Sequence, residues 1–220
     1  GGIMDIDFSL EKLLNVDLEN YENVVHTVLY VGNHRSYFDI VMTYVRVPRT
    51  TGYISKVEFL KIPLLSNWMK NLHCLFLDRS DLKAGMKTIL AAIEEIKNGV
   101  SICIFPEGTR NRTDAPLLEF HAGSLKIAEK AQCPIVPMTI ANAEQIFEAL
   151  HPQDKGIIEY GEPIETKNLD RTQQKALTSQ VVARISETYE KNMKLLSGEK
   201  NEPYCIFYLD DRRIDLEKDR

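Results

Sequence analysis

Short apolar runs alternate with longer amphipathic segments along most of the chain. Apolar residues fill 101–105 and 135–140, as in strands buried on both faces, and recur every three or four residues over 82–96, as in a helix with one buried face. The same two patterns predict further strands at 24–31, 53–55, 74–77 and 157–160, and further helices at 8–14, 37–45, 62–72, 122–131 and 172–196. This alternation predicts an α/β fold, a single domain with a largely parallel central sheet flanked by helices.

The length and composition fit one domain. The chain has 220 residues, of which 44% are hydrophobic and 27% charged, as is typical of globular proteins. We expect residues 1–198 to form the domain and residues 199–220 a charged C-terminal arm that is peripheral or partly disordered. No run approaches the roughly 18 apolar residues of a membrane span, so we expect a chain that lies on a membrane rather than one that crosses it.

The charge is distributed unevenly. The formal net charge of −5 argues against general nucleic-acid binding, yet residues 33–126 carry 13 Lys and Arg against 9 Asp and Glu. This excess fits an anionic substrate, and lysines scattered over solvated faces explain it equally well. The cysteines are too far apart for a metal or redox motif, so we expect a reducing, cytosolic setting. They are Cys74, Cys103, Cys133 and Cys205. Cys74 and Cys103 lie in apolar strand-like runs and are expected to be buried thiols.

A histidine with a carboxylate five residues later follows the predicted strand at 24–31. A neutral imidazole accepts protons near neutral pH, and a carboxylate on one ring nitrogen leaves the other aimed at a substrate hydroxyl. The first turn of the helix predicted at 37–45 brings Asp39 back to His34, so the pair is a candidate general base. No Gly-x-Ser-x-Gly elbow is present, which favours the substrate's own hydroxyl as nucleophile. Asn33 and nearby backbone N–H groups are candidates for supporting the pocket or an oxyanion.

A polar turn follows the predicted strand at 101–105. Gly108 permits close backbone approach to a ligand, Thr109 offers a hydroxyl, and the planar guanidinium of Arg110 matches phosphate oxygens. A plain polar turn closed by a pair between Glu107 and Arg110 explains these residues equally well. Arg79 is a third group of this kind, and its expected position favours an anion site.

Arg79 ends the predicted strand at 74–77, and the carboxyl ends of parallel strands meet at one edge of a sheet. We therefore expect Arg79 to converge with the polar turn on one pocket. The chain lacks the phosphate-loop, dinucleotide and His-Glu-x-x-His metal motifs, and we expect no metal. Residues 59–70 combine bulky apolar side chains, Trp68 and flanking lysines, a composition typical of a membrane-interface segment and also compatible with core packing.

With these motifs in place, the chain resembles the bacterial lysophosphatidic acid acyltransferases of the glycerolipid acyltransferase superfamily. Their Asn-His-x-x-x-x-Asp block matches residues 33–39, and their Phe-Pro-Glu-Gly-Thr-Arg block matches 105–110 without a mismatch. An apolar run ending in Asp-Arg matches 76–79, and a Val-Pro block matches 135–138. The order and spacing agree over roughly residues 14 to 165. The family often has Gly at the position of His73 and Lys at that of His121.

The resemblance implies acyl transfer from an acyl thioester, acyl-coenzyme A or acyl carrier protein, to the free hydroxyl of lysophosphatidic acid, giving phosphatidic acid. It implies His34 as the base and Asp39 as its partner, without a metal or cofactor. The substrate-binding residues that it implies are Asn33, Arg79, Glu107, Gly108, Thr109 and Arg110.

The resemblance also implies that the protein acts at the cytoplasmic face of the cell membrane. It would be peripheral there or anchored by a segment absent from this chain. Three alternatives stay open at this point. The acceptor is instead glycerol 3-phosphate or another lysophospholipid; the chain is a peripheral lipid-binding protein without turnover; or it is a thioesterase that needs no acceptor.

Overall fold

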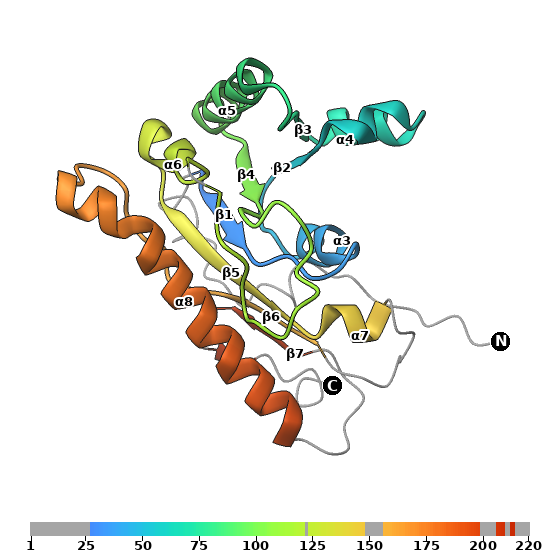
Figure 1. Ribbon diagram of the computed structural model, residues 1–220, viewed down its shortest axis with the longest axis vertical. Coiled ribbons are helices and arrows are strands. Elements are labelled where there is room, and N and C mark those ends of the chain that lie inside the picture. Colours follow the sequence, from blue (N-terminus) through green and yellow to red (C-terminus); the bar gives the residue numbers. More distant parts are fainter. Residues whose placement is uncertain (1–26, 122, 148–155, 199–205, 210–211, 214–220) are drawn as a thin grey trace, which may run out of the picture.

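The computed structural model describes residues 27–121, 123–147, 156–198, 206–209 and 212–213 (Figure 1). The strands are β1 (Leu29–Gly32), β2 (Thr51–Lys56), β3 (Leu75–Leu77), β4 (Ser101–Ile104), β5 (Ile135–Ala141), β6 (Ile157–Tyr160), β7 (Ile206–Leu209) and β8 (Arg212–Arg213). The helices are α3 (Asp39–Tyr44), the 3-10 helix η1 (Val57–Lys61), α4 (Leu65–Asn71), α5 (Leu82–Lys97), α6 (Lys126–Ala131), α7 (Ala143–Phe147) and α8 (Arg171–Gly198). The helix predicted at 8–14 lies outside the described residues.

The strands form one sheet in the order β3-β2-β4-β1-β5-β6-β7-β8. The first five are parallel to their neighbours, β6 runs antiparallel to β5, and β7 is again parallel to β6. The predicted α/β fold with a largely parallel sheet is therefore confirmed. Since β1 lies at the centre between β4 and β5, the chain that leaves its carboxyl end stays close to the chain that leaves β4.

The central strands are buried on both faces. Leu29 and Val31 of β1 belong to one hydrophobic cluster with α5, α6 and α8, while Tyr30 between them belongs to a second cluster that includes residues of α3 and α4. Successive side chains of a strand point to opposite faces, so helices cover the sheet on both sides. This arrangement explains why these strands have continuous apolar sequences. Cys74 and Cys103 are buried thiols, as predicted. Cys133 is buried too, and burial raises its pKa to about 11.

Several elements differ from the predicted ones. Helix α6 begins at Lys126, later than predicted, because Gly123 has a φ of 87°, which no right-handed helix accepts. The short helix α7 was not predicted, because five residues carry too little periodicity to show. Strands β7 and β8 fall within the predicted C-terminal arm and extend the sheet beside β6, and the division at residue 198 stays a prediction.

Candidate active site

The candidate base lies in the loop that leaves β1. His34 Nδ1 is 2.8 Å from Asp39 Oδ2, and the ring of His34 stacks on Phe105 with centroids 4.7 Å apart. Asp39 Oδ2 also accepts hydrogen bonds from the backbone N–H groups of Arg35 at 2.7 Å and Ser36 at 2.9 Å. Since this oxygen already accepts two N–H groups, the tautomer that fits the contact has the ring proton on Nδ1, and Nε2 is then left to accept a proton from a substrate. The His34 side chain is 19% exposed, whereas Asp39 is fully buried.

The backbone of this loop is committed to internal contacts. The N–H groups of Arg35 and Ser36 donate to Asp39, and that of His34 donates to Glu107 Oε1 at 2.7 Å. These three N–H groups therefore do not stabilise a substrate oxyanion, in contrast to the expectation from the sequence. They fix the position of the imidazole instead.

Two of the predicted substrate-binding residues support the loop from within. The side chain of Asn33 is fully buried and bonds the backbone of Ile140 twice, from Nδ2 to the carbonyl at 2.8 Å and from the N–H to Oδ1 at 2.7 Å. Glu107 is buried and accepts the N–H groups of His34 and Leu118, both at 2.7 Å. In the structure both side chains bond the protein's own backbone, which fits the pocket-supporting role expected for Asn33, and substrate binding by either side chain stays a prediction. Burial raises the pKa of Glu107, and the two backbone hydrogen bonds oppose that rise.

The predicted anion site forms around the turn after β4. Gly108 has a φ of 70°, and a side chain there would meet the guanidinium of Arg79. Arg79 Nη1 donates to the Gly108 carbonyl at 2.6 Å and lies 3.4 Å from His121 Nε2. Burial lowers the pKa of Arg79, which Glu58 opposes, and a guanidinium stays charged at neutral pH. The predicted convergence of Arg79 with the turn is thus present.

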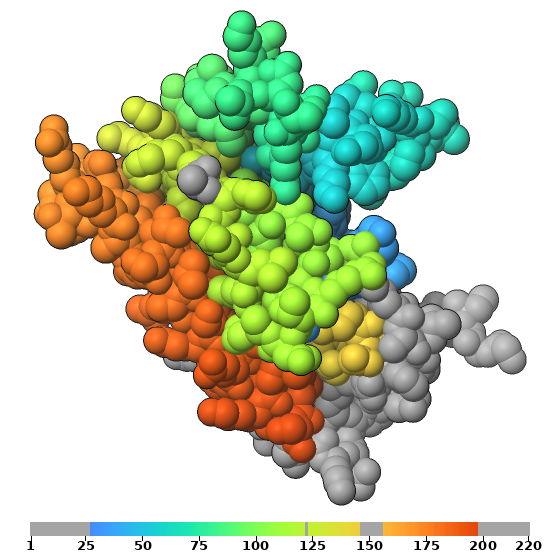
Figure 2. Space-filling model, in the orientation of Figure 1, coloured from blue at the N-terminus to red at the C-terminus, as the bar shows by residue number. Residues whose placement is uncertain are grey.

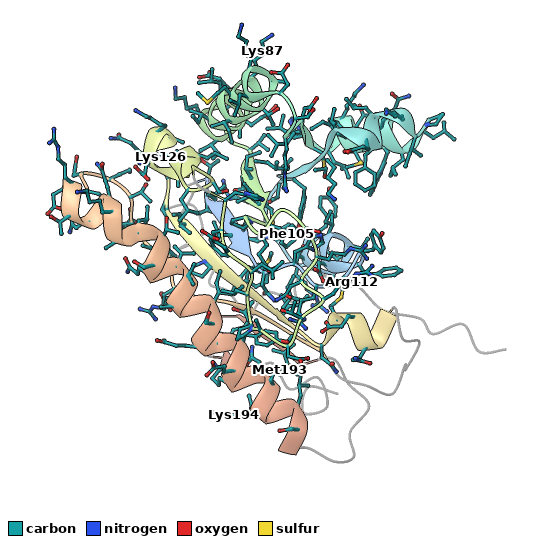
Figure 3. The ribbon with its side chains drawn as sticks, in the orientation of Figure 1. Lys87, Phe105, Arg112, Lys126, Met193 and Lys194 are labelled. Carbon is teal, nitrogen blue, oxygen red and sulfur yellow. The ribbon has the colours of Figure 1, made fainter. Side chains whose placement is uncertain are left out.

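The turn and the base loop also contact each other. The guanidinium of Arg110 lies over the ring of Tyr37, with Cζ 3.3 Å from the centroid, and the N–H of Asn111 donates to the His34 carbonyl at 2.7 Å. Thr109 is exposed next to Arg110. The yellow-green segment that follows β4 covers the centre of the face in Figure 2. Figure 3 labels Phe105 where this segment leaves β4 and Arg112 farther along it.

The residues that hold this segment were not predicted from the sequence. Arg35 Nε donates to Glu144 Oε1 at 2.6 Å, and its other nitrogens donate to the carbonyls of Thr113 and Ala115. Because Glu144 lies 109 residues further along the chain, local sequence carries no signal of this pair. The position of Arg35 next to the base was the only available clue.

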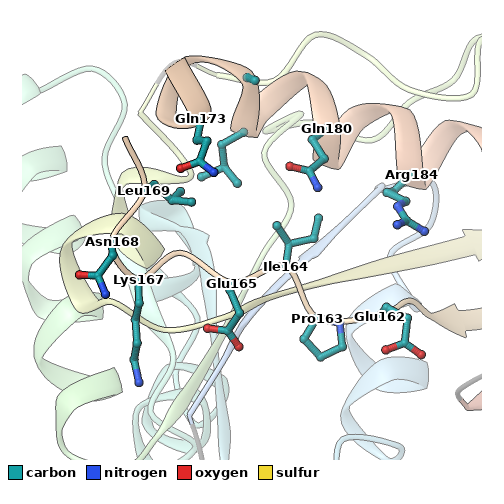
Figure 4. Close-up of a pocket in the computed structure, with 12 residues that line it drawn as sticks. Glu162, Pro163, Ile164, Glu165, Lys167, Asn168, Leu169, Gln173, Gln180 and Arg184 are labelled. Atoms are coloured by element: carbon teal, nitrogen blue, oxygen red, sulfur yellow. The ribbon is translucent and has the colours of Figure 1, made fainter. Parts of the chain in front are cut away.

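A separate hollow of about 520 Å³ lies between the start of α8 and the segment before it (Figure 4). Its lining includes Glu162, Lys167 and Arg184, and none of the predicted site residues. Ile164 in this lining pairs with Ile135, the first residue of β5, so the hollow lies at the opposite end of the sheet from His34. Its position gives it no part in the site described above.

A model of the acyltransferase family matches residues 15–141, which is more than half of the chain and includes both motifs. The chain belongs to the acyltransferase family. The protein named probable 1-acyl-sn-glycerol-3-phosphate acyltransferase of Mycoplasma pneumoniae is 31% identical over 193 residues, covering 81% of this chain and 72% of its own length. The 1-acyl-sn-glycerol-3-phosphate acyltransferase of Helicobacter pylori is 34% identical over 119 residues, covering 54% of this chain.

A solved structure supports the same assignment of this acyltransferase. The 1-acyl-sn-glycerophosphate (LPA) acyltransferase PlsC of Thermotoga maritima has a TM-score of 0.62 and 27% identity, covering 80% of this chain and 69% of its own. The matched part is half of the Helicobacter pylori protein. The predicted resemblance to the glycerolipid acyltransferases is confirmed by these matches.

Proposed function

We propose that this acyltransferase moves a fatty acyl group from an acyl thioester to the free hydroxyl of lysophosphatidic acid, forming phosphatidic acid. The observation that carries the proposal is the His34–Asp39 pair, 2.8 Å apart, joined by backbone hydrogen bonds to a turn with exposed donors and cations. The names of its relatives in Mycoplasma pneumoniae and Thermotoga maritima give the same acceptor.

In this mechanism the acceptor hydroxyl attacks the thioester carbonyl directly. His34 Nε2 takes the hydroxyl proton as the new ester bond forms, and Asp39 stabilises the resulting imidazolium. The carbon–sulfur bond then breaks, and the thiol of coenzyme A or acyl carrier protein leaves with the proton from His34. The proposed reaction uses no acyl-enzyme, metal ion or cofactor.

The phosphate of the acceptor is assigned to the cationic rim of the turn. Arg79 and Arg110 supply guanidinium groups, Thr109 supplies a hydroxyl, and Gly108 leaves the space that the guanidinium of Arg79 fills. Guanidinium groups bind phosphate oxygens with paired donors, which favours a phosphorylated acceptor over a neutral one.

We also propose that the protein acts at a membrane surface, on the cytoplasmic side. Among the described residues, twelve large apolar side chains are exposed, and all except Leu195 lie between residues 37 and 90. Leu64, just before α4, is 83% exposed, and Trp68 within α4 is 56% exposed. Lys61 and Lys70 are nearby in the sequence. Apolar and aromatic side chains among lysines are typical of segments that lie in a lipid interface. No helix in the described parts of the chain has the length and apolar character needed to span a bilayer.

Trp68 is the only tryptophan of the chain, so its fluorescence tests this contact directly. We expect a blue shift of its emission when vesicles containing phosphatidylglycerol are added, and a smaller one with phosphatidylcholine alone. Unchanged emission at lipid concentrations at which the protein co-sediments with the vesicles would mean that another part of the protein contacts the membrane.

The reaction is tested by measuring thiol release from a long-chain acyl-coenzyme A and from acyl carrier protein, with and without lysophosphatidic acid, in mixed micelles. We expect release that needs the acceptor, phosphatidic acid as product, and a rate about 10²–10⁴ lower in His34→Ala. The variant should fold, because the bonds of His34 to Glu107 and Asn111 involve its backbone. Release without acceptor would indicate a thioesterase, release with glycerol 3-phosphate alone a different acceptor, and binding without release a non-catalytic lipid-binding protein.

A further inference from the structure

Arg35 joins parts of the molecule that are distant in sequence. Its side chain is only 9% exposed, and Nε donates to Glu144 Oε1 of α7 at 2.6 Å. Nη2 and Nη1 donate to the carbonyls of Thr113 and Ala115 at 3.2 and 3.3 Å. The guanidinium also lies 5.2 Å from the ring centre of Tyr189 in α8. All three guanidinium nitrogens are therefore engaged in a nearly buried position.

The two carbonyls belong to the loop formed by residues 111–118, which directly follows the anion turn. One end of this loop is bonded to the base loop directly and the other through Glu107. At the first end the N–H of Asn111 donates to the His34 carbonyl, and at the other the N–H of Leu118 donates to Glu107 Oε2, both at 2.7 Å. Glu107 Oε1 in turn accepts the N–H of His34. Hydrogen bonds therefore connect His34 to Glu107, Glu107 to the end of the loop, and the start of the loop back to His34.

Arg35 holds the middle of this loop. The side chains of residues 112–115 are exposed, and apart from those to Arg35 the hydrogen bonds of this stretch stay within the same loop, to Asn111 and between Ala115 and Thr113. The backbone N–H of Arg35 meanwhile donates to Asp39 Oδ2 at 2.7 Å. Arg35 thus contacts Asp39, the partner of the candidate base, through its main chain. Its side chain contacts the loop that follows Arg110.

We propose that Arg35 is a positioning residue that fixes the 111–118 loop, and with it Arg110, relative to His34, so that the acceptor binds with its hydroxyl at the base. The inference rests on the proposed function for its kinetic consequence. The side chain of Arg35 touches no reacting atom in this scheme. It acts through the loop, and its effect therefore falls on acceptor binding more than on proton transfer.

The kinetic test is Arg35→Lys, with Arg184→Lys on the exposed face of α8 as the matched control. A lysine keeps one positive charge for Glu144 but has no planar fork for the two carbonyls. We expect the KM for lysophosphatidic acid to rise about tenfold, with kcat within about threefold of native and the KM for the acyl donor unchanged. Arg184→Lys should match the native enzyme. A fall in kcat at unchanged acceptor KM would overturn the proposal.

A second variant tests the other end of the same contact. Glu144→Gln keeps an oxygen acceptor for Nε and loses only the charge, so we expect a smaller rise of the acceptor KM, about threefold. A rise larger than that of Arg35→Lys would mean that α7, rather than the loop, controls the acceptor, and would contradict the proposal. This variant keeps the test decisive if Arg35→Lys folds poorly.

A third measurement does not depend on catalysis. Hydrogen exchange of the full chain without substrate should be at least about tenfold faster in peptides covering 111–118 of Arg35→Lys than in the native or Arg184→Lys protein. Peptides from β1, β4 and β5 should exchange as in the native protein. Uniform acceleration would indicate general destabilisation, and unchanged exchange a loop that does not need Arg35, so either result would overturn the proposal. A native protein that fails to acylate lysophosphatidic acid would refute the proposed function while leaving this readout intact.

Discussion

The loop that carries His34 and the turn that carries Arg110 are neighbours built in different ways. In the loop, residues 33–39, Asn33 and Asp39 are fully buried, and His34 is 19% exposed with Nδ1 fixed. In the turn, Thr109 is exposed and Arg110 rests on the ring of Tyr37. A general base works only at hydrogen-bond distance from its proton, whereas attraction between a guanidinium and a phosphate extends over several ångströms. The proton transfer therefore needs rigidity in the loop, whereas a displacement at the rim weakens acceptor binding and leaves the proton transfer itself intact.

Glu107 shows that sequence position does not decide which region a residue serves. It belongs to the turn by its place in the chain, yet its two carboxylate oxygens hold the N–H groups of His34 and Leu118. Gly108 and Arg110, its neighbours in the turn, belong to the phosphate site of the proposed function. The boundary between the rigid and the tolerant region thus runs between residues 107 and 108. Substitutions on either side of it should have different kinetic signatures.

Asp39→Asn tests the rigid region most strongly. Asparagine keeps one oxygen for the three N–H donors, and the fold should persist, but a neutral amide does not stabilise an imidazolium as a carboxylate does. We expect kcat to fall about 10- to 10³-fold with little change in the acceptor KM, measured from initial rates at saturating donor. Glu187→Gln, an exposed change on α8, is the control. A kcat within threefold of native would contradict the assignment of Asp39.

Glu107→Gln should weaken the hydrogen bonds that hold the base loop, because it removes one acceptor. Both oxygens accept N–H groups, and a glutamine presents one oxygen and one NH₂, so the cost is about 1–3 kcal/mol of unfolding free energy. The pKa of Glu107 is raised in the folded protein, so its protonation stabilises the fold most fully below its ordinary value of 4.5, and this contribution is lost as the pH rises through the raised pKa. The stability advantage of the native protein over the variant should therefore shrink as the pH rises from 4.5. Urea unfolding of both proteins between pH 4 and 7 measures it, and an advantage that grows with pH would contradict the expected sign.

Arg110→Lys probes the tolerant region. The charge stays and the fork is lost, so we expect the KM for lysophosphatidic acid to rise about tenfold while kcat stays near native. Saturation curves for the acceptor at fixed donor measure the change, and the donor KM serves as the internal control. If kcat fell and the acceptor KM did not change, Arg110 would belong to the rigid region and the comparison would fail.

The features that could be predicted from the sequence are those formed by residues close together in the chain. The strands were visible because burial on both faces leaves continuous apolar runs, and α5 because its apolar positions recur at helical spacing. His34 and Asp39 are five residues apart, within reach of one helical turn. The links from Asn33 to Ile140 and from Arg35 to Glu144 span 107 and 109 residues. They exist only because the sheet places β1 beside β5, and no local pattern records that neighbourhood. A supporting role for Asn33 could be expected from the sequence, but its partner Ile140 could not, for the same reason.

Tyr37→Leu should produce the smallest effect, because it changes how Arg110 is held without changing Arg110 itself. The ring of Tyr37 is 64% exposed, and cation–π contacts at exposed sites contribute about 0.5–1 kcal/mol. That loss corresponds to an acceptor KM about 2- to 5-fold higher, with kcat unchanged. Tyr37→Phe is the matched control, since it keeps the ring under the guanidinium and should stay near native. If Phe and Leu raised the KM equally, the hydroxyl rather than the ring would hold Arg110, and the rim of the site would depend on a directional hydrogen bond, as the base loop does.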